Sequence, residues 1–303
     1  MEVLYFFEQL RMPVLNEFML LITRFGEETA FLAAALVVFW CVDKKSGYFL
    51  MSVGFAGTIL NSVLKLICRV PRPWVLDENF TILEKAREAA TGYSFPSGHS
   101  QTAVGTFGSL VCIAKKKWLK TIFAVIAILV PVSRMYVGVH TPWDVLAGSA
   151  LSLLLIFALR PMVLRKGDKA MKLLIGGMLL MSLGNLLYVE LFPFPADMDA
   201  HNIASGVKNA YTMVGCLAGV AVVYLGERKY VNFTTEAIWW AQIWKVVLGV
   251  SLVLLVKEGL RVPLEVILTD AMAARAVRYF LIVVVAGFLW PMTFQWFSRL
   301  GEK

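Results

Sequence analysis

Long apolar segments recur along the chain from residue 29 to residue 297, and they constrain its fold more than any other feature. A helix needs about 20 apolar residues to cross the hydrocarbon core of a membrane, and several segments reach that length. Because 59% of the 303 residues are hydrophobic and only 17% are charged, a soluble domain could not bury so much apolar surface. The sequence therefore predicts an all-α fold, a polytopic transmembrane helical bundle.

We predict nine spans, preceded by an N-terminal amphipathic helix in the membrane interface. Gln9, Asn16 and Thr23 recur every seven residues and form a polar stripe. In the otherwise apolar segment 3–25, this stripe favours an interfacial helix that is interrupted near Pro13, and a tilted first span is the alternative. The nine predicted spans cover approximately residues 29–42, 48–67, 99–114, 118–137, 143–159, 171–191, 206–225, 238–256 and 277–297.

Much of the net charge of +8 lies in short connectors between apolar segments, such as residues 115–117 and 165–169. This distribution is typical of cytoplasmic loops, so we expect no nucleic-acid partner, and the N-terminus is predicted outside and the C-terminus inside. The four cysteines are scattered without a C-x-x-C pair and predict neither a disulfide framework nor a zinc site. No basic run precedes an apolar core at the N-terminus, so a cleaved signal peptide is not expected.

A basic connector after residue 160 is the best internal boundary. Residues 1–160 contain five spans and all of the motifs described below. Residues 161–303 form an additional four-helix transmembrane region of unknown role, in which the Gly215-x-x-x-Gly219 pair predicts a close helix–helix contact.

Charged residues near the end of the eighth span are interpreted as a solvated helix end, with a charged rim as the alternative. These residues are Lys257, Glu258, Arg261 and Glu265. The third histidine of the chain, His201, lies in an acidic loop and is interpreted as a solvated residue rather than a ligand.

Three polar clusters interrupt the apolar pattern, and the predicted topology brings all three to the external face. Ionisable residues at membrane depth are costly and mark functional sites. The clusters are Lys65-x6-Arg72-Pro73, Pro96-Ser97-Gly98-His99 and Ser133-Arg134-x5-His140-x3-Asp144.

The cations of these clusters suit a multiply charged anion. Lys65, Arg72 and Arg134 on one surface would bind phosphate oxygens, because the guanidinium fork matches their geometry. Ser97 and Gly98 stand where a helix starts, so unpaired backbone N–H groups can donate to the same anion.

Two histidines and an aspartate add the groups that phosphoryl transfer needs. His140 and Asp144 are four residues apart, so the carboxylate can hold one ring nitrogen and leave the other free to attack phosphorus. His99 would then protonate the leaving oxygen. Each part alone has a simpler interpretation, such as a snorkelling Lys65 or a helix-capping Asp144, but the three clusters together favour one site.

The clusters match the three-part signature K-x6-R-P, P-S-G-H and S-R-x5-H-x3-D, and the chain resembles the type 2 phosphatidic acid phosphatase superfamily over about its first 160 residues. The resemblance implies that residues 1–160 are a phosphatase core without a metal or other cofactor. It implies that His140 is the nucleophile and forms a phosphohistidine, that Asp144 orients it, and that His99 is the general acid. The implied phosphate-binding residues are Lys65, Arg72, Ser97, Gly98 and Arg134.

The resemblance implies hydrolysis of a lipid phosphate or diphosphate of the phosphatidate, phosphatidylglycerol phosphate or polyprenyl diphosphate type. The alternatives are a sugar-phosphate phosphatase resembling glucose-6-phosphatase and a lipid-phosphate carrier that does not cleave its ligand. The expected partners are the phosphorylated lipid substrate and membrane lipids, and homo-oligomerisation is left open. We expect the protein in a bacterial plasma membrane, with its active site on the non-cytoplasmic face.

Overall fold

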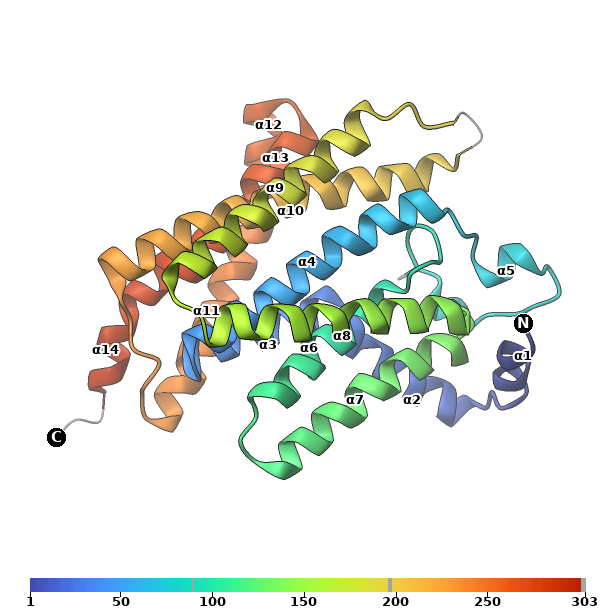
Figure 1. The fold of residues 1–303 in the computed structure, drawn as a ribbon, viewed down its shortest axis with the longest axis horizontal. Coiled ribbons are helices and arrows are strands. Elements are labelled where there is room, and N and C mark those ends of the chain that lie inside the picture. Colours follow the sequence, from blue (N-terminus) through green and yellow to red (C-terminus); the bar gives the residue numbers. More distant parts are fainter. Residues whose placement is uncertain (89, 196–197, 301–303) are drawn as a thin grey trace. The chain divides into compact units, whose positions relative to one another are not determined.

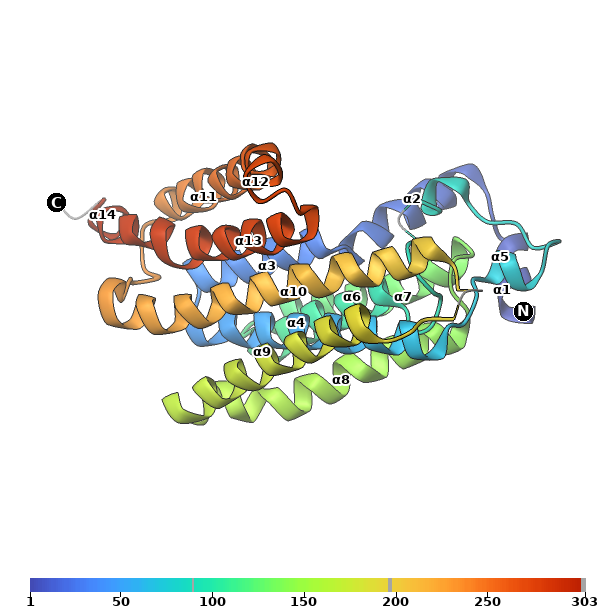
Figure 2. The ribbon, with the colours of Figure 1, turned by 90° about the horizontal axis from the view of Figure 1, so that it is seen from above.

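The computed structural model describes residues 1–88, 90–195 and 198–300, and this part of the chain is helical without β-strands (Figures 1 and 2). The predicted all-α fold is therefore confirmed. The α-helices are α1 Glu2–Gln9, α2 Pro13–Thr23, α3 Glu28–Cys41, α4 Lys44–Cys68, α5 Pro73–Leu76, α6 Gly98–Ile113, α7 Lys117–Tyr136, α8 Pro142–Leu164, α9 Asp168–Leu191, α10 Ala200–Gly226, α11 Trp239–Gly259, α12 Arg261–Leu268, α13 Ala271–Val284 and α14 Phe294–Arg299. Short 3-10 or π segments are η1 Arg24–Gly26, η2 Glu84–Ala86, η3 Glu227–Val231, η4 Val285–Leu289 and η5 Trp290–Thr293.

Seven helical segments of the described chain are long and apolar enough to cross a membrane. The protein is thus an integral membrane helical bundle. The predicted spans 29–42 and 99–114 correspond to α3 and α6, which have 14 and 16 residues. Since both are shorter than a typical span, the count of nine stays a prediction. The seven segments are Lys44–Leu76, Lys117–Tyr136, Pro142–Leu164, Asp168–Leu191, Ala200–Val231, Trp239–Leu268 and Ala271–Arg299.

The N-terminal segment forms two helices, α1 and α2, and Pro13 occupies the first turn of α2. Two members of the predicted polar stripe contact α7. The hydroxyl of Tyr136 donates to Asn16 Oδ1 at 2.7 Å, and Arg134 Nη1 donates to Thr23 Oγ1 at 2.6 Å. These residues therefore support α7, whereas the interfacial position of the segment stays a prediction.

The chain forms two compact units. The first comprises residues 1–32, 50–161 and 193–206, and the second comprises residues 33–49, 162–192 and 207–303. The first unit contains all three polar clusters. The division of function at residue 160 stays a prediction, because neither unit is one continuous stretch of chain.

In the second unit, small residues of α10 allow close packing against α13. A Cβ atom on Gly215 would lie 2.1 Å from the carbonyl oxygen of Ala276, and one on Gly219 would lie 2.8 Å from Val283 Cβ. Only glycine permits this approach. The helix–helix contact predicted from the Gly215-x-x-x-Gly219 pair is confirmed.

His201 is exposed, but it lies in the first turn of α10 and not in a loop. The side chain of Asp199 accepts a hydrogen bond from the backbone N–H of Asn202 at 2.9 Å. This cap starts the helix earlier than the acidic composition suggested, so the predicted loop position of His201 is wrong.

Candidate active site

Helix ends within the first unit bring the predicted site residues together. They are Lys65 in the last turn of α4, Arg72 as the N-cap of α5, Ser97 as the N-cap of α6, Gly98 and His99 in the first turn of α6, Arg134 in the last turn of α7, His140 in the connector from α7 to α8, and Asp144 in the first turn of α8.

Arg72 is buried and fixed directly against His140. Its Nη1 donates to His140 Nε2 at 2.9 Å and to the carbonyl oxygen of Val139 at 3.0 Å. Its Nε and Nη2 donate to the carbonyl oxygens of Gly92 and Thr91 at 3.1 and 2.7 Å. Three backbone acceptors thus hold one guanidinium beside the imidazole, which places a positive charge where a phosphate would meet this ring.

The other side of the His140 ring faces Asp144. The distance from His140 Nδ1 to Asp144 Oδ2 is 3.5 Å, and both side chains are buried. The Ser94 hydroxyl donates to the same carboxylate oxygen at 2.6 Å, and its Oγ lies 3.4 Å from Nδ1. The backbone N–H of Thr141 also donates to Asp144 Oδ2, at 2.7 Å. Because a guanidinium cannot accept a hydrogen bond, Nε2 is the acceptor, and the proton of a neutral ring lies on Nδ1.

Burial lowers the pKa of His140 well below its usual value, and the positive charges of Arg72, Arg134 and Lys65 lower that pKa further. The cause is the cost of adding a proton to a desolvated ring among cations. At neutral pH the imidazole is therefore uncharged and keeps the lone pair that a nucleophile needs.

The start of α6 lies against the first turns of α8. The backbone N–H of Ser97 donates to the carbonyl oxygen of Asp144 at 2.9 Å, and Ser97 Oγ caps α6 by accepting from the N–H of Ser100. A Cβ atom on Gly148 would lie only 2.4 Å from the carbonyl oxygen of Ser97. By contrast, a Cβ on Gly98 would meet only Asn61 Oδ1 at 3.7 Å, so Gly98 leaves space beside the helix terminus.

Several donors of the site have no protein acceptor among the described residues. Arg134 is fully buried, and beyond its bond to Thr23 its Nε and Nη2 atoms have no partner. His99 Nε2 is also buried without a partner. Lys65 differs from these residues, because it donates to the carbonyl oxygen of Tyr93. Buried polar atoms are nearly always hydrogen-bonded, so these open positions fit a ligand that supplies acceptor oxygens.

The sequence did not predict that Ser94, Thr23 and Gly148 support the site, although Thr23 belongs to the predicted polar stripe. Ser94 bridges Asp144 and His140, Thr23 holds Arg134, and Gly148 admits the carbonyl oxygen of Ser97. Each of these residues acts on a partner that is distant in the chain, so no local spacing pattern predicts the contact. In the described residues, no cluster of three or more metal-ligating side chains occurs.

Comparisons with known proteins indicate the family to which the chain is similar. The family model described as "PAP2 superfamily" matches residues 45–168, and the one described as "PAP2 superfamily phosphatase, transmembrane extension" matches residues 211–303. Phosphatidylglycerophosphatase B of Bacillus subtilis is 34% identical over 164 residues, which cover 50% of this chain and 76% of that protein.

Two further proteins are similar to about half of the chain. An undecaprenyl-diphosphatase of Sulfolobus acidocaldarius is 31% identical over 139 residues, which cover 46% of this chain and 66% of that protein, slightly less than two thirds of its length. The crystal structure of a transmembrane PAP2 type phosphatidylglycerolphosphate phosphatase from Bacillus subtilis shares 32% identity, covers 52% of this chain and 81% of that chain, and superposes with a TM-score of 0.43.

Proposed function

We propose that this chain, which belongs to the PAP2 superfamily of phosphatases, hydrolyses a lipid phosphate or diphosphate through a phosphohistidine at His140. One observation carries the proposal. A buried, neutral imidazole has Arg72 Nη1 2.9 Å from its Nε2 atom and Asp144 on its Nδ1 side. These contacts support the roles of His140 as nucleophile, Asp144 as its orienting carboxylate and Arg72 as a phosphate-binding cation.

In the first step, His140 Nε2 attacks phosphorus and the bond from phosphorus to the leaving oxygen breaks. Arg72 must first turn from Nε2 to a phosphate oxygen, which a bound anion favours. The bound phosphate anion offsets the surrounding cations, so His99 takes up a proton from solvent as the substrate binds and gives this proton to the leaving oxygen. In the second step, water attacks the phosphohistidine, His99 takes up the water proton, and inorganic phosphate leaves with the N–P bond electrons returned to His140.

The remaining site residues stabilise the charge on phosphate. Arg134 offers its unpartnered Nε and Nη2 atoms, and Lys65 adds a further positive charge. The backbone N–H of Ser97 already donates to the carbonyl oxygen of Asp144, so at the start of α6 we assign phosphate binding to the N–H of Gly98, beside the space that its missing side chain leaves. Such donors act on the oxygens that carry charge in the transition state. No step requires a metal or another cofactor.

A lipid is the favoured substrate because the helices place the chain in the bilayer. The similar proteins are named for phosphatidylglycerophosphate and undecaprenyl diphosphate, both of them lipids. A headgroup can reach a site at the membrane surface while its tails stay among lipids. We further propose that the site opens on the non-cytoplasmic face of a bacterial plasma membrane, as the basic connectors indicate.

The test compares His140→Ala with His201→Ala in purified protein, with EDTA present. His201 is the matched control because it is exposed and lies outside the pocket. We expect phosphate release from phosphatidylglycerophosphate, phosphatidate or undecaprenyl diphosphate by the wild type and the control only, and a radiolabelled phosphohistidine in both. Undiminished turnover by His140→Ala would reject the nucleophile, and faster turnover of glucose 6-phosphate than of any lipid would reject the substrate class.

A further inference from the structure

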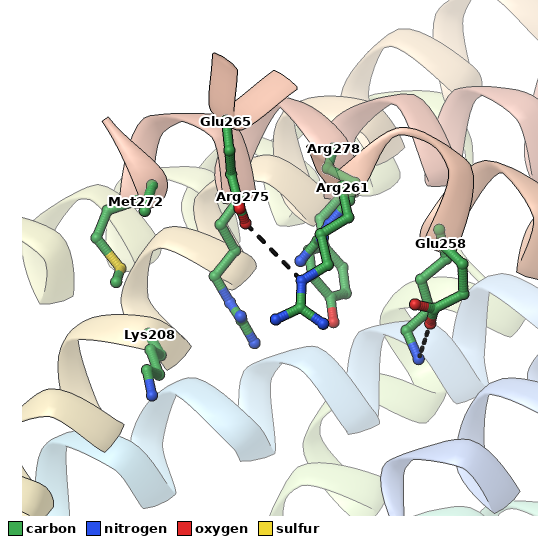
Figure 3. A pocket seen from close by; sticks show the side chains of 10 residues that line it. Lys208, Glu258, Arg261, Glu265, Met272, Arg275 and Arg278 are labelled. Atoms are coloured by element: carbon green, nitrogen blue, oxygen red, sulfur yellow. Dashed lines mark ion pairs between the residues drawn. The ribbon is translucent and has the colours of Figure 1, made fainter. Parts of the chain in front are cut away.

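A cavity of about 430 Å³ lies within the second unit, and none of its lining residues is assigned to catalysis (Figure 3). Residues of α10, α11, α12 and α13 line it. Figure 3 shows that basic side chains from these helices point into the same space. The basic lining residues are Lys208, Lys257, Arg261, Arg275 and Arg278.

The cavity has an excess of positive charge. Five basic residues and two acidic residues line it, which leaves a net charge of +3. Each acidic residue is matched by one cation, since Lys257 pairs with Glu258 at 3.4 Å and Arg261 with Glu265 at 3.9 Å. The other three cations form no ion pair with any residue that the structure describes. This excess favours an anion as the occupant.

Two arginines of α13 are held in position for such an anion. Arg275 and Arg278 are three residues apart, and both guanidinium groups lie beside the ring of Tyr279, at 5.5 and 5.8 Å from its centroid. Arg275 Nε donates to Thr212 Oγ1 at 2.8 Å. Arg278 is only 8% exposed, and its Nε has no hydrogen-bond partner in the described chain.

A snorkelling or freely solvated arginine would not be buried with an open donor. An unpartnered guanidinium N–H in a buried position carries a desolvation cost that an acceptor oxygen would offset. The guanidinium fork matches the geometry of phosphate oxygens, as it does that of carboxylate oxygens. The four residues interpreted from the sequence as a solvated helix end all line this cavity, and that interpretation stays a prediction. Arg278 is a buried member of the same lining.

The two sides of helix α12 indicate the depth in the membrane at which this cavity lies. Arg261 and Glu265 of α12 line the cavity, whereas Val262, Val266 and Ile267 on its neighbouring faces are 64%, 71% and 73% exposed. A short helix with one apolar and one charged side is suited to the boundary between headgroups and acyl chains. Phosphate groups of membrane lipids are concentrated at that depth.

From the charge, the open donor and the amphipathic helix, we infer that this cavity binds the headgroup phosphate of an anionic membrane lipid as a second, non-catalytic site. The inference goes beyond the proposed hydrolysis and does not depend on it. Phosphatidylglycerol is the appropriate probe, because it is an anionic phosphodiester without a terminal phosphate group for the catalytic site to remove.

The experiment counts lipid molecules retained by the delipidated full-length protein after exchange into phosphatidylglycerol or phosphatidylcholine, by native mass spectrometry. The wild type is expected to retain one phosphatidylglycerol molecule and no phosphatidylcholine. Loss of one charge-assisted contact corresponds to about a ten-fold loss of affinity, so Lys208→Gln should lose about that factor and Arg275→Gln/Arg278→Gln about a hundred-fold. Lys208 is exposed, which makes its substitution safe for folding.

Two controls separate this site from general charge effects and from catalysis. Arg165→Gln/Arg299→Gln removes two exposed arginines outside the cavity and should retain the lipid as the wild type does. Lys65→Gln alters the catalytic pocket and should also retain it. Equal retention by wild type, Lys208→Gln and the double arginine variant would overturn the inference. Calorimetric binding of inorganic phosphate by a protein that retains no phosphatidylglycerol would overturn the lipid as the source of the phosphate.

Discussion

Replacing Ser94 with alanine tests whether the aspartate positions the nucleophile through this hydroxyl. Ser94 donates to Asp144 Oδ2 at 2.6 Å, and its Oγ is 3.4 Å from His140 Nδ1. The direct distance from Nδ1 to Asp144 Oδ2 is 3.5 Å, which is long for a hydrogen bond. Ser94 therefore completes the link between the carboxylate and the imidazole. The substitution removes that link without touching the phosphate-binding cations.

The expected effect follows from the strength of the lost bond. A hydrogen bond to a charged group contributes about 1.5–3 kcal/mol, which corresponds to a roughly 10- to 100-fold loss of kcat if the bond acts in the transition state. KM should change little, because Ser94 has no part in holding phosphate. Steady-state phosphate release in detergent, with the lipid that the wild type turns over fastest, measures both constants.

Ser109→Ala is the matched control for this substitution. Ser109 is equally buried, and its hydroxyl has no partner in the described residues, so its removal should leave kcat unchanged. A Ser94→Ala protein with wild-type kcat would refute the positioning role. A raised KM with unchanged kcat would equally refute it, since the serine would then act on substrate binding.

Three further changes probe the rest of the pocket. Thr23→Val removes the acceptor that lies 2.6 Å from Arg134 Nη1, so KM should rise about ten-fold in steady-state assays, and an unchanged KM would contradict this. Gly148→Val would place a Cβ 2.4 Å from the Ser97 carbonyl oxygen and should abolish phosphate release. Burial and nearby cations lower the pKa of His140, so this residue stays unprotonated until the pH falls below 6.5, the usual pKa of histidine. As the pH is lowered, kcat/KM should therefore begin to fall only below pH 6.5, and a fall that begins at a higher pH would refute the assignment of His140 as the nucleophile.

The sequence predicted the convergence of the site because its residues stand at helix ends in fixed local spacings. Asp144 follows His140 at the fourth position, and the structure places these side chains next to each other. Ser94 and Thr23 could not be predicted in the same way. Their partners are 50 and 111 residues away, so only the tertiary fold brings them together.

The sequence predicted the membrane spans better than it predicted the helix types within them. Apolar length identified the helical bundle, and the spacing of Gly215 and Gly219 identified a packing contact, because both depend on local sequence. The predicted span 277–297 lies within the segment Ala271–Arg299, but its helix changes from α to π to 3-10 geometry along α13, η4, η5 and α14. Pro291 cannot donate a backbone hydrogen bond and stands in η5, and hydropathy does not reveal this change of helix type.

The two proposed phosphate-binding sites, the active site of the first unit and the cavity of the second, are alike in one physical feature and differ in one chemical feature. In each, an arginine is buried with an N–H that no described residue accepts, Arg134 in the first unit and Arg278 in the second. Burying a guanidinium without enough acceptors is costly, so each pocket gains stability when an anion supplies oxygens. Only the first pocket also holds imidazoles, His99 and His140. Binding of phosphate therefore belongs to both pockets, whereas cleavage requires the nucleophile and acid that the second pocket lacks among its lining residues.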